Sequence, residues 1–110
     1  MKIDYIYSER KKKMVAQLLE TVFVYGYEIP KGYETDFASV PKILWSILPP
    51  IGKHNRAALL HDYLYDSKIG TRKQADKLFL KQMEIDGVSF AARWAMYLGV
   101  RIFAKRWWVK

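Results

Sequence analysis

The sequence predicts an α+β fold, with a small N-terminal antiparallel β-sheet followed by three or four helices packed on it. Residues 1–37 consist of short alternating and β-branched stretches separated by turn residues, which is typical of strands. Residues 38–110 carry longer apolar patterns with helical spacing and recognisable caps. A length of 110 residues matches the common size of one domain, so we expect a single domain.

The first strands are predicted from alternation and composition. Ile3, Tyr5 and Tyr7 alternate with polar residues, which indicates a half-buried strand over residues 1–8. The basic run at residues 10–13 then forms an exposed turn. Residues 14–29 are rich in Val, Leu, Phe and Tyr, and at least their second half is expected to be strand.

Two short segments within this region need separate interpretation. Residues 17–20 are compatible with a helix as well as with a strand. Pro30-Lys31-Gly32 is a turn signal, because proline fixes φ and glycine accepts positive φ. It predicts a hairpin between residues 25–29 and residues 33–37.

The segment after the sheet carries candidate caps. Asp36 and Ser39 are good capping residues, and Pro41 suits the first turn of a short helix. Ser39 as a nucleophile and Asp36 as a metal ligand are the functional alternatives, but no Gly-x-Ser-x-Gly elbow surrounds Ser39. Pro49-Pro50 ends the short helix.

The central predicted helix covers residues 55–66 and carries a polar line on an apolar surface. His61 and Tyr65 lie four residues apart and therefore on one face, and His54 falls two turns earlier on the same stripe. Burying polar groups costs free energy unless they are bonded. The line therefore needs partners or a function, and we place the candidate site here.

Two further helices are predicted. Thr71 and Gln74 form a capping-box pattern at the start of a helix that runs to about residue 85. Asp76 lies on the edge of the apolar side of that helix. Residues 89–108 form one last helix, apolar over most of its circumference.

His61 and Asp76 are the strongest candidates for chemistry. Two antiparallel helices joined by a short loop bring a carboxylate at Asp76 beside His61, where it fixes the imidazole tautomer and creates a water-activating base. The alternative is a structural pair that holds two helices together. Asp62 is a candidate ligand for a hard cation such as calcium. His54 belongs to this polar line or is an exposed helix start, and no His-Glu-x-x-His pattern supports zinc.

Charge and cysteine content bound the partners. The formal net charge is +8, and there are no cysteines, which excludes disulfides and thiolate catalysis. The C-terminal tail interleaves basic and indole side chains, which suits an anionic phospholipid surface. The alternative is that its tryptophans close the core or contact a protein partner, and nucleic acid is a weaker expectation because no binding motif is present. The candidate surface residues are Arg101, Lys105, Arg106, Trp107, Trp108 and Lys110.

Two blocks of sequence resemble a known family. Thr35-Asp36-Phe37-Ala38-Ser39-Val40-Pro41 and His61-Asp62-Tyr63-Leu64-Tyr65, with Ala75-Asp76 after them, resemble the phage and prophage family catalogued as domain of unknown function 1353. The resemblance covers residues 32–99. It implies a phage or prophage origin, and, as no signal peptide or membrane span is visible, a place in the host cytoplasm or the virion.

The helix motif also resembles the catalytic helices of phospholipase A-two, especially the parvovirus form. The resemblance implies that His61 activates water, Asp62 binds calcium, and Tyr65 and Asp76 support and orient His61. The glycine-rich calcium loop of that family corresponds to residues 48–53, which hold one glycine here. We therefore expect either a phospholipase-like lipid hydrolase with calcium as its cofactor, or a non-enzymatic virion or host-interaction module.

Overall fold

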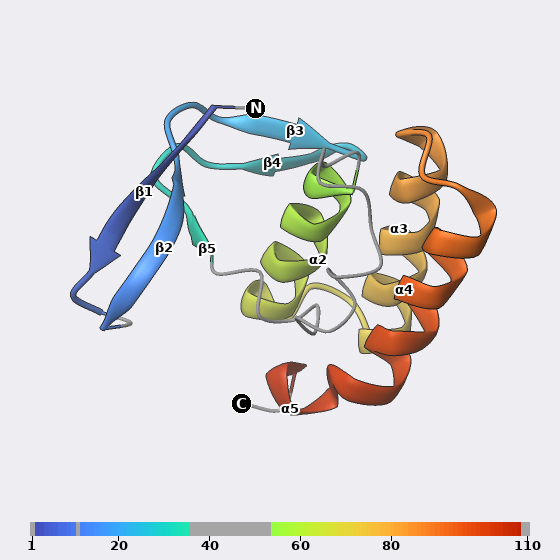
Figure 1. Cartoon of the computed structure of the whole chain (residues 1–110). Helices are drawn as coiled ribbons and strands as arrows, with labels where there is room; N and C mark the ends of the chain where they lie inside the picture. The colour runs from blue at the N-terminus through green and yellow to red at the C-terminus, as the bar shows by residue number, and fades with distance from the viewer. Residues whose placement is uncertain (1, 11, 36–53, 109–110) are drawn as a thin grey trace. The chain divides into compact units, whose positions relative to one another are not determined.

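The computed structural model describes residues 2–10, 12–35 and 54–108, apart from the side chains of residues 106 and 107. The chain separates into two compact units, Met1–Asp36 and Phe37–Lys110. In the described residues the first unit holds the strands and the second the helices (Figure 1), which confirms the α+β class. The single-domain expectation stays a prediction, and the short helix expected after Pro41 lies outside the described residues.

The first unit contains a three-stranded antiparallel sheet and a two-stranded ribbon. The sheet has the order β1-β2-β5, and the ribbon pairs β3 with β4. Their bounds are β1 (Ile3–Ser8), β2 (Lys13–Leu18), β3 (Val22–Val24), β4 (Tyr27–Ile29) and β5 (Glu34–Thr35).

The β1–β2 hairpin confirms the first strand and the exposed basic turn. Ser8 pairs with Lys13, and Lys12 takes a positive φ of 57° between them. The alternation, however, does not place the tyrosines inside, because Tyr5 and Tyr7 are 67% and 57% exposed. Ser8 is buried instead, and its hydroxyl donates to Glu34 Oε1 at 2.8 Å, which satisfies the buried polar group.

The pairing predicted around Pro30 is wrong. β4 pairs with β3 across the two-residue turn Tyr25-Gly26, whose φ values are 51° and 81°. Positive φ values at both turn residues match the twist of an antiparallel hairpin, so this tight turn pairs β4 with β3. The predicted turn after Pro30 is present, because the Tyr33 amide donates to the Pro30 carbonyl at 3.1 Å. The strand that follows this turn, β5, pairs with β2 and not with β4.

The helical alternative for residues 17–20 is also wrong. Leu18 belongs to β2, where it pairs with Ile3. Its amide donates to the Tyr33 carbonyl at 2.9 Å, and its carbonyl accepts from the Gly32 amide at 2.9 Å. These non-local hydrogen bonds fix residue 18 as extended chain.

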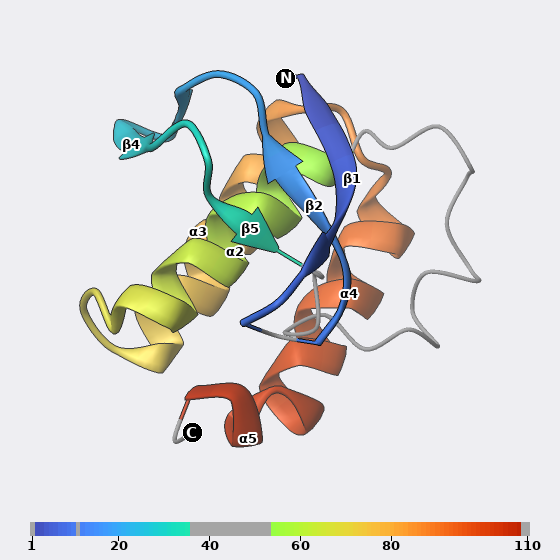
Figure 2. The same ribbon diagram turned by 90° about the vertical axis from the view of Figure 1, so that its left-hand side faces the viewer.

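In its described residues the second unit contains α2 (Asn55–Ser67), α3 (Arg72–Ile85), α4 (Phe90–Phe103) and the short α5 (Lys105–Trp108). α2 and α3 run antiparallel and side by side (Figures 1 and 2), and α3 contacts α4 on its other side. α5 contacts both α2 and α4. None of the helices formed by the described residues is long and apolar enough to cross a membrane.

The helix ends follow local sequence. The capping box at Thr71 is confirmed, because Thr71 Oγ1 accepts from the Gln74 amide at 3.1 Å and Gln74 Oε1 accepts from the Thr71 amide at 2.9 Å. The single last helix is wrong in one respect. α4 ends at Phe103, and Ala104 separates it from α5.

Candidate functional site

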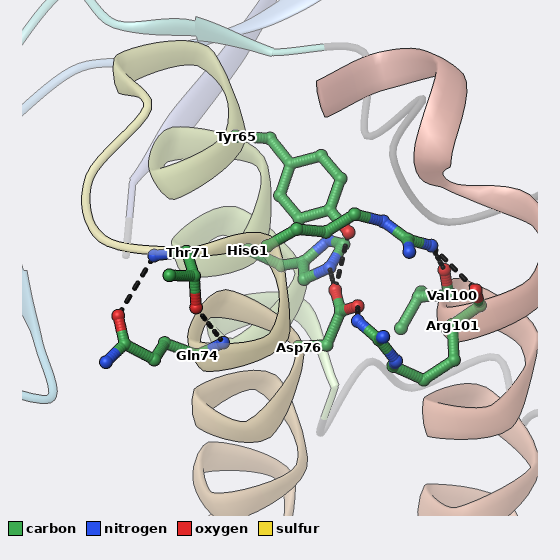
Figure 3. A network of polar contacts seen from close by, with 8 residues as sticks. His61, Tyr65, Thr71, Gln74, Asp76, Val100 and Arg101 are labelled. Carbon is green, nitrogen blue, oxygen red and sulfur yellow. Dashed lines mark hydrogen bonds and ion pairs between the residues drawn. The ribbon is translucent and has the colours of Figure 1, made fainter. Parts of the chain in front are cut away.

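The site centres on the carboxylate of Asp76, which accepts two hydrogen bonds from α2. His61 Nε2 lies 2.6 Å from Asp76 Oδ1, and the Tyr65 hydroxyl donates to the same oxygen at 2.6 Å (Figure 3). His61 and Tyr65 are one helical turn apart on α2, so they present both donors to one point. The predicted contact between His61 and Asp76 is therefore present, and Tyr65 supports it.

The other carboxylate oxygen is held by a residue from α4. Arg101 Nη1 donates to Asp76 Oδ2 at 2.7 Å (Figure 3). The Arg101 side chain is 32% exposed, whereas the Asp76 side chain is fully buried. From the sequence we placed Arg101 in a surface patch and missed this role. No local pattern indicates which basic side chain, distant in the chain, contacts Asp76.

Arg72 adds a second link between α3 and α4 that sequence reasoning also missed. Its Nη2 donates to the carbonyls of Val100 and Arg101 at 2.8 and 2.7 Å. These carbonyls lie in the last turn of α4, where the helix end carries partial negative charge, and the Val100 carbonyl also accepts from the Ala104 amide at 3.0 Å. Arg72 therefore caps α4 and places Arg101 next to Asp76.

The imidazole and the carboxylate are both enclosed. His61 and Asp76 each have 0% exposure, although Asp76 was expected at the edge of the apolar side of α3. The ring of His61 lies against two aromatic rings, with centroid distances of 4.2 Å to Tyr65 and 4.8 Å to Phe79. These contacts leave the imidazole little freedom to rotate.

The environment keeps Asp76 ionised. Burial, the largest single influence, raises the pKa of Asp76, but hydrogen bonds from His61, Tyr65 and Arg101 and the charge of His61 lower it. The lowering effects prevail, so the pKa of Asp76 lies below its ordinary value. Burial and the adjacent carboxylate raise the pKa of Tyr65 above its ordinary value, so its hydroxyl remains a donor.

This arrangement determines which nitrogen of His61 carries a proton. An ionised carboxylate only accepts hydrogen bonds, so Nε2 must donate to Asp76. In the neutral ring the lone pair is then on Nδ1. A carboxylate in this position also stabilises the protonated ring, so Asp76 and His61 together have the chemistry of an oriented general base.

The remaining candidates differ in position. Asp62 and His54 are both buried, with 6% and 4% exposure, and His54 occupies the N-cap of α2. Burial lowers the pKa of His54. Asp36 and Ser39 lie outside the described residues. Among residues 2–10, 12–35 and 54–108, no three His, Cys, Asp or Glu side chains come together as a metal site.

The predicted surface residues of the tail do not share one environment. The Trp108 ring meets the Tyr65 ring edge-on at 5.2 Å, and the ammonium of Lys68 lies 5.2 Å from the Trp108 ring. Lys105 is exposed. The side chains of Arg106 and Trp107, and all of Lys110, lie outside the described structure. Trp108 thus covers the Tyr65 side of the site.

Comparison with known proteins identifies the family. A family model described as "Protein of unknown function (DUF1353)" matches residues 14–100, and the chain belongs to this family. Two relatives come from Sinorhizobium fredii. The uncharacterized protein y4jT is 31% identical over 83 residues, and the uncharacterized protein y4iH is 29% identical over 84 residues.

The two matches cover most of this chain but a smaller part of each relative. Each match covers 74% of this chain, whereas it covers 25% of y4jT and 35% of y4iH. The chain therefore spans about a quarter to a third of the length of these relatives. No solved structure matches the chain.

Proposed function

We propose that this chain provides an ester-hydrolysing module that acts on phospholipid, with His61 as general base and Asp76 as its positioning residue. The observation that supports the proposal most strongly is the 2.6 Å contact between His61 Nε2 and Asp76 Oδ1. The Tyr65 hydroxyl on the same oxygen adds support. The resemblance of the His61-Asp62-x-x-Tyr65 motif and Asp76 to phospholipase A-two gives these residues the same roles.

In the proposed step an opening movement of the enclosed site first brings water to Nδ1 of His61. His61 Nδ1 takes a proton from water as the water oxygen bonds to the ester carbonyl carbon. When the tetrahedral intermediate collapses, the carbon–oxygen bond to the alcohol breaks and the imidazolium returns the proton to the leaving oxygen. Water and ester thus become acid and alcohol. Asp76 stays ionised throughout and stabilises the imidazolium.

Calcium is part of the proposal only as a dependence to be tested. Calcium takes six to eight oxygen ligands, and Asp62 is the one carboxylate that the resemblance assigns to it. The described residues do not gather the further acidic ligands. Residues 48–53, where the resemblance places a calcium loop, lie outside the described residues. The step above therefore uses no metal.

The membrane surface and the cellular setting are also proposed. Lys105, Arg106 and Lys110 supply positive charge in the C-terminal segment, and anionic phospholipid is the surface that such charge favours. The resemblance to phage and prophage proteins supports a role in the host cytoplasm or the virion. Because His61 is fully enclosed, the proposal includes an opening movement that admits the substrate.

A non-enzymatic virion or host-interaction module is the second candidate. The observation that favours it is the complete burial of His61 and Asp76 within a network that joins three helices. In that case the network serves stability alone. The two candidates differ in whether the wild-type chain turns over phospholipid at all.

The test is release of fatty acid from vesicles of phosphatidylcholine and phosphatidylglycerol, with calcium and with a chelator. Wild type is compared with His61→Ala and with Gln82→Ala. Gln82 is a suitable control because it is also buried and polar, and it bonds to Asp86 at 3.0 Å without touching the His61 network. We expect wild type and Gln82→Ala to release fatty acid and His61→Ala to be slower by about 10² to 10⁴-fold.

The other outcomes contradict the proposal in different ways. No fatty acid release by wild type under either condition would reject hydrolysis and favour the non-enzymatic module. Equal rates for wild type and folded His61→Ala would reject His61 as the base. Activity that survives the chelator would reject the calcium dependence but leave the dyad in place.

A further inference from the structure

One face of α4 carries large apolar side chains that the structure leaves exposed. Phe90, Trp94, Leu98 and Ile102 follow each other at intervals of four residues, which places them along one side of the helix. We call these four residues the apolar stripe. Their exposed fractions are 66%, 38%, 54% and 67%.

The stripe is not the packed side of the helix. Met96 and Val100 form that side, and both are 0% exposed. A continuous exposed apolar surface on a protein usually marks an interaction site. The aromatic part of the stripe is ordered by its own contacts, because Trp94 lies 6.1 Å from Phe90 and 5.6 Å from Tyr97 between ring centroids.

The segment that carries the stripe has charged residues of one sign. Residues 87–110 contain no Asp or Glu but five basic residues, Arg93, Arg101, Lys105, Arg106 and Lys110. The guanidinium of Arg93 lies 5.3 Å from the Phe90 ring, so a cation stands directly beside the stripe. An exposed apolar row with a cation beside it, in a segment whose charged residues are all basic, favours an anionic lipid surface.

From this we infer that α4 lies flat on an anionic phospholipid bilayer and inserts the apolar stripe between the lipid headgroups. The helix has 14 residues and is about 21 Å long, too short to cross a hydrocarbon core of about 30 Å, so it binds parallel to the surface. This inference rests on the proposed function for its partner class and adds the face of the protein that touches it.

Two other occupants fit the stripe less well. In a second copy of the chain, the charged residues of this segment are also all basic. Packing the two segments against each other would bring like charges together, which is unfavourable. Nucleic acid would match the charge, but the exposed aliphatic side chains of Leu98 and Ile102 have no planar face for stacking on bases. A bilayer accepts both the aliphatic groups and the cations.

The test uses the 110-residue chain and vesicles made of ether-linked phospholipids, which have no acyl ester to hydrolyse. Binding therefore does not depend on the proposed chemistry. Co-sedimentation is measured with phosphatidylcholine alone and with phosphatidylcholine containing phosphatidylglycerol. The variant is Leu98→Ser with Ile102→Ser, and the matched control is Ile85→Ser, which replaces an equally exposed residue (66%) at the end of α3.

We expect wild type and Ile85→Ser to bind the anionic vesicles and to bind neutral vesicles much less. The stripe variant should bind the anionic vesicles about tenfold more weakly or worse, because two apolar side chains no longer enter the lipid. Equal binding by wild type and the stripe variant, or no binding by wild type, would overturn the inference. A wild-type dimer in sedimentation that the stripe variant loses, with vesicle binding unchanged, would assign the stripe to a second copy.

Discussion

Replacing Asp76 with alanine is expected to lower the free energy of unfolding by about 3–5 kcal/mol, measured by urea denaturation at pH 7. Asp76 accepts from His61 and Tyr65 on α2 and from Arg101 on α4, so its loss leaves three donors on two helices without their shared acceptor. Two of those donors are buried and cannot turn to water. A cost below about 1 kcal/mol would contradict the central place of Asp76 in the second unit.

Two controls make this prediction specific. Arg101→Ala should cost less, because its side chain is partly exposed and Asp76 keeps two donors after its removal. Acid supplies the second control. The pKa of Asp76 is lowered in the folded protein, so its contribution is present above its unfolded pKa of about 3.9 and is lost as the pH falls through its folded pKa. The difference between wild type and Asp76→Ala should therefore shrink in acid.

Replacing Asp76 with asparagine is expected to reduce turnover of phospholipid vesicles on the order of 10⁴-fold, with little change in KM. Asparagine keeps the shape of the side chain, but it carries no charge to stabilise the imidazolium and no longer requires the proton on Nε2. The comparison is made at a temperature at which circular dichroism finds both proteins folded. A loss of less than tenfold would contradict the role of Asp76 as a positioning residue.

Helix starts and the His61–Asp76 contact were predictable because they depend on nearby sequence. Thr71 and Gln74 define the start of α3 by themselves, and the short connection between α2 and α3 brings residue 76 back to residue 61. The apolar composition and the spacing of four between His61 and Tyr65 then indicated one polar line on α2. These features depend on local geometry, which the identity and spacing of nearby residues determine.

The strand pairing and the partners from α4 were not predictable for a physical reason. Tyr25 has a φ of 51°, a conformation that a bulky side chain rarely adopts, so the tight turn between β3 and β4 has no sequence signal. Arg101 is 25 residues from Asp76 in the chain, and the sequence pattern only grouped it with the other basic residues of the last helix. The packing of the helices determines which basic side chain reaches the Asp76 carboxylate.

The apolar stripe could not be predicted from the sequence for a similar reason. A helix that is apolar over most of its circumference is expected to be buried on every side. The structure buries Met96 and Val100 but leaves Phe90, Leu98 and Ile102 exposed. Sequence composition therefore indicated the apolar character of α4 but not the division between its core side and its outer side.

The central claim is that Asp76 holds His61 with the proton on Nε2, and it can be tested without knowing the substrate. The measurement is a long-range ¹H–¹⁵N correlation spectrum of the imidazoles at neutral pH, with His61 assigned by comparison with His61→Ala. We predict the pattern of a protonated Nε2 for His61 in wild type, and a change of this pattern in Asp76→Asn. A neutral His61 with its proton on Nδ1 would contradict the account, because Nε2 could then not donate to the carboxylate.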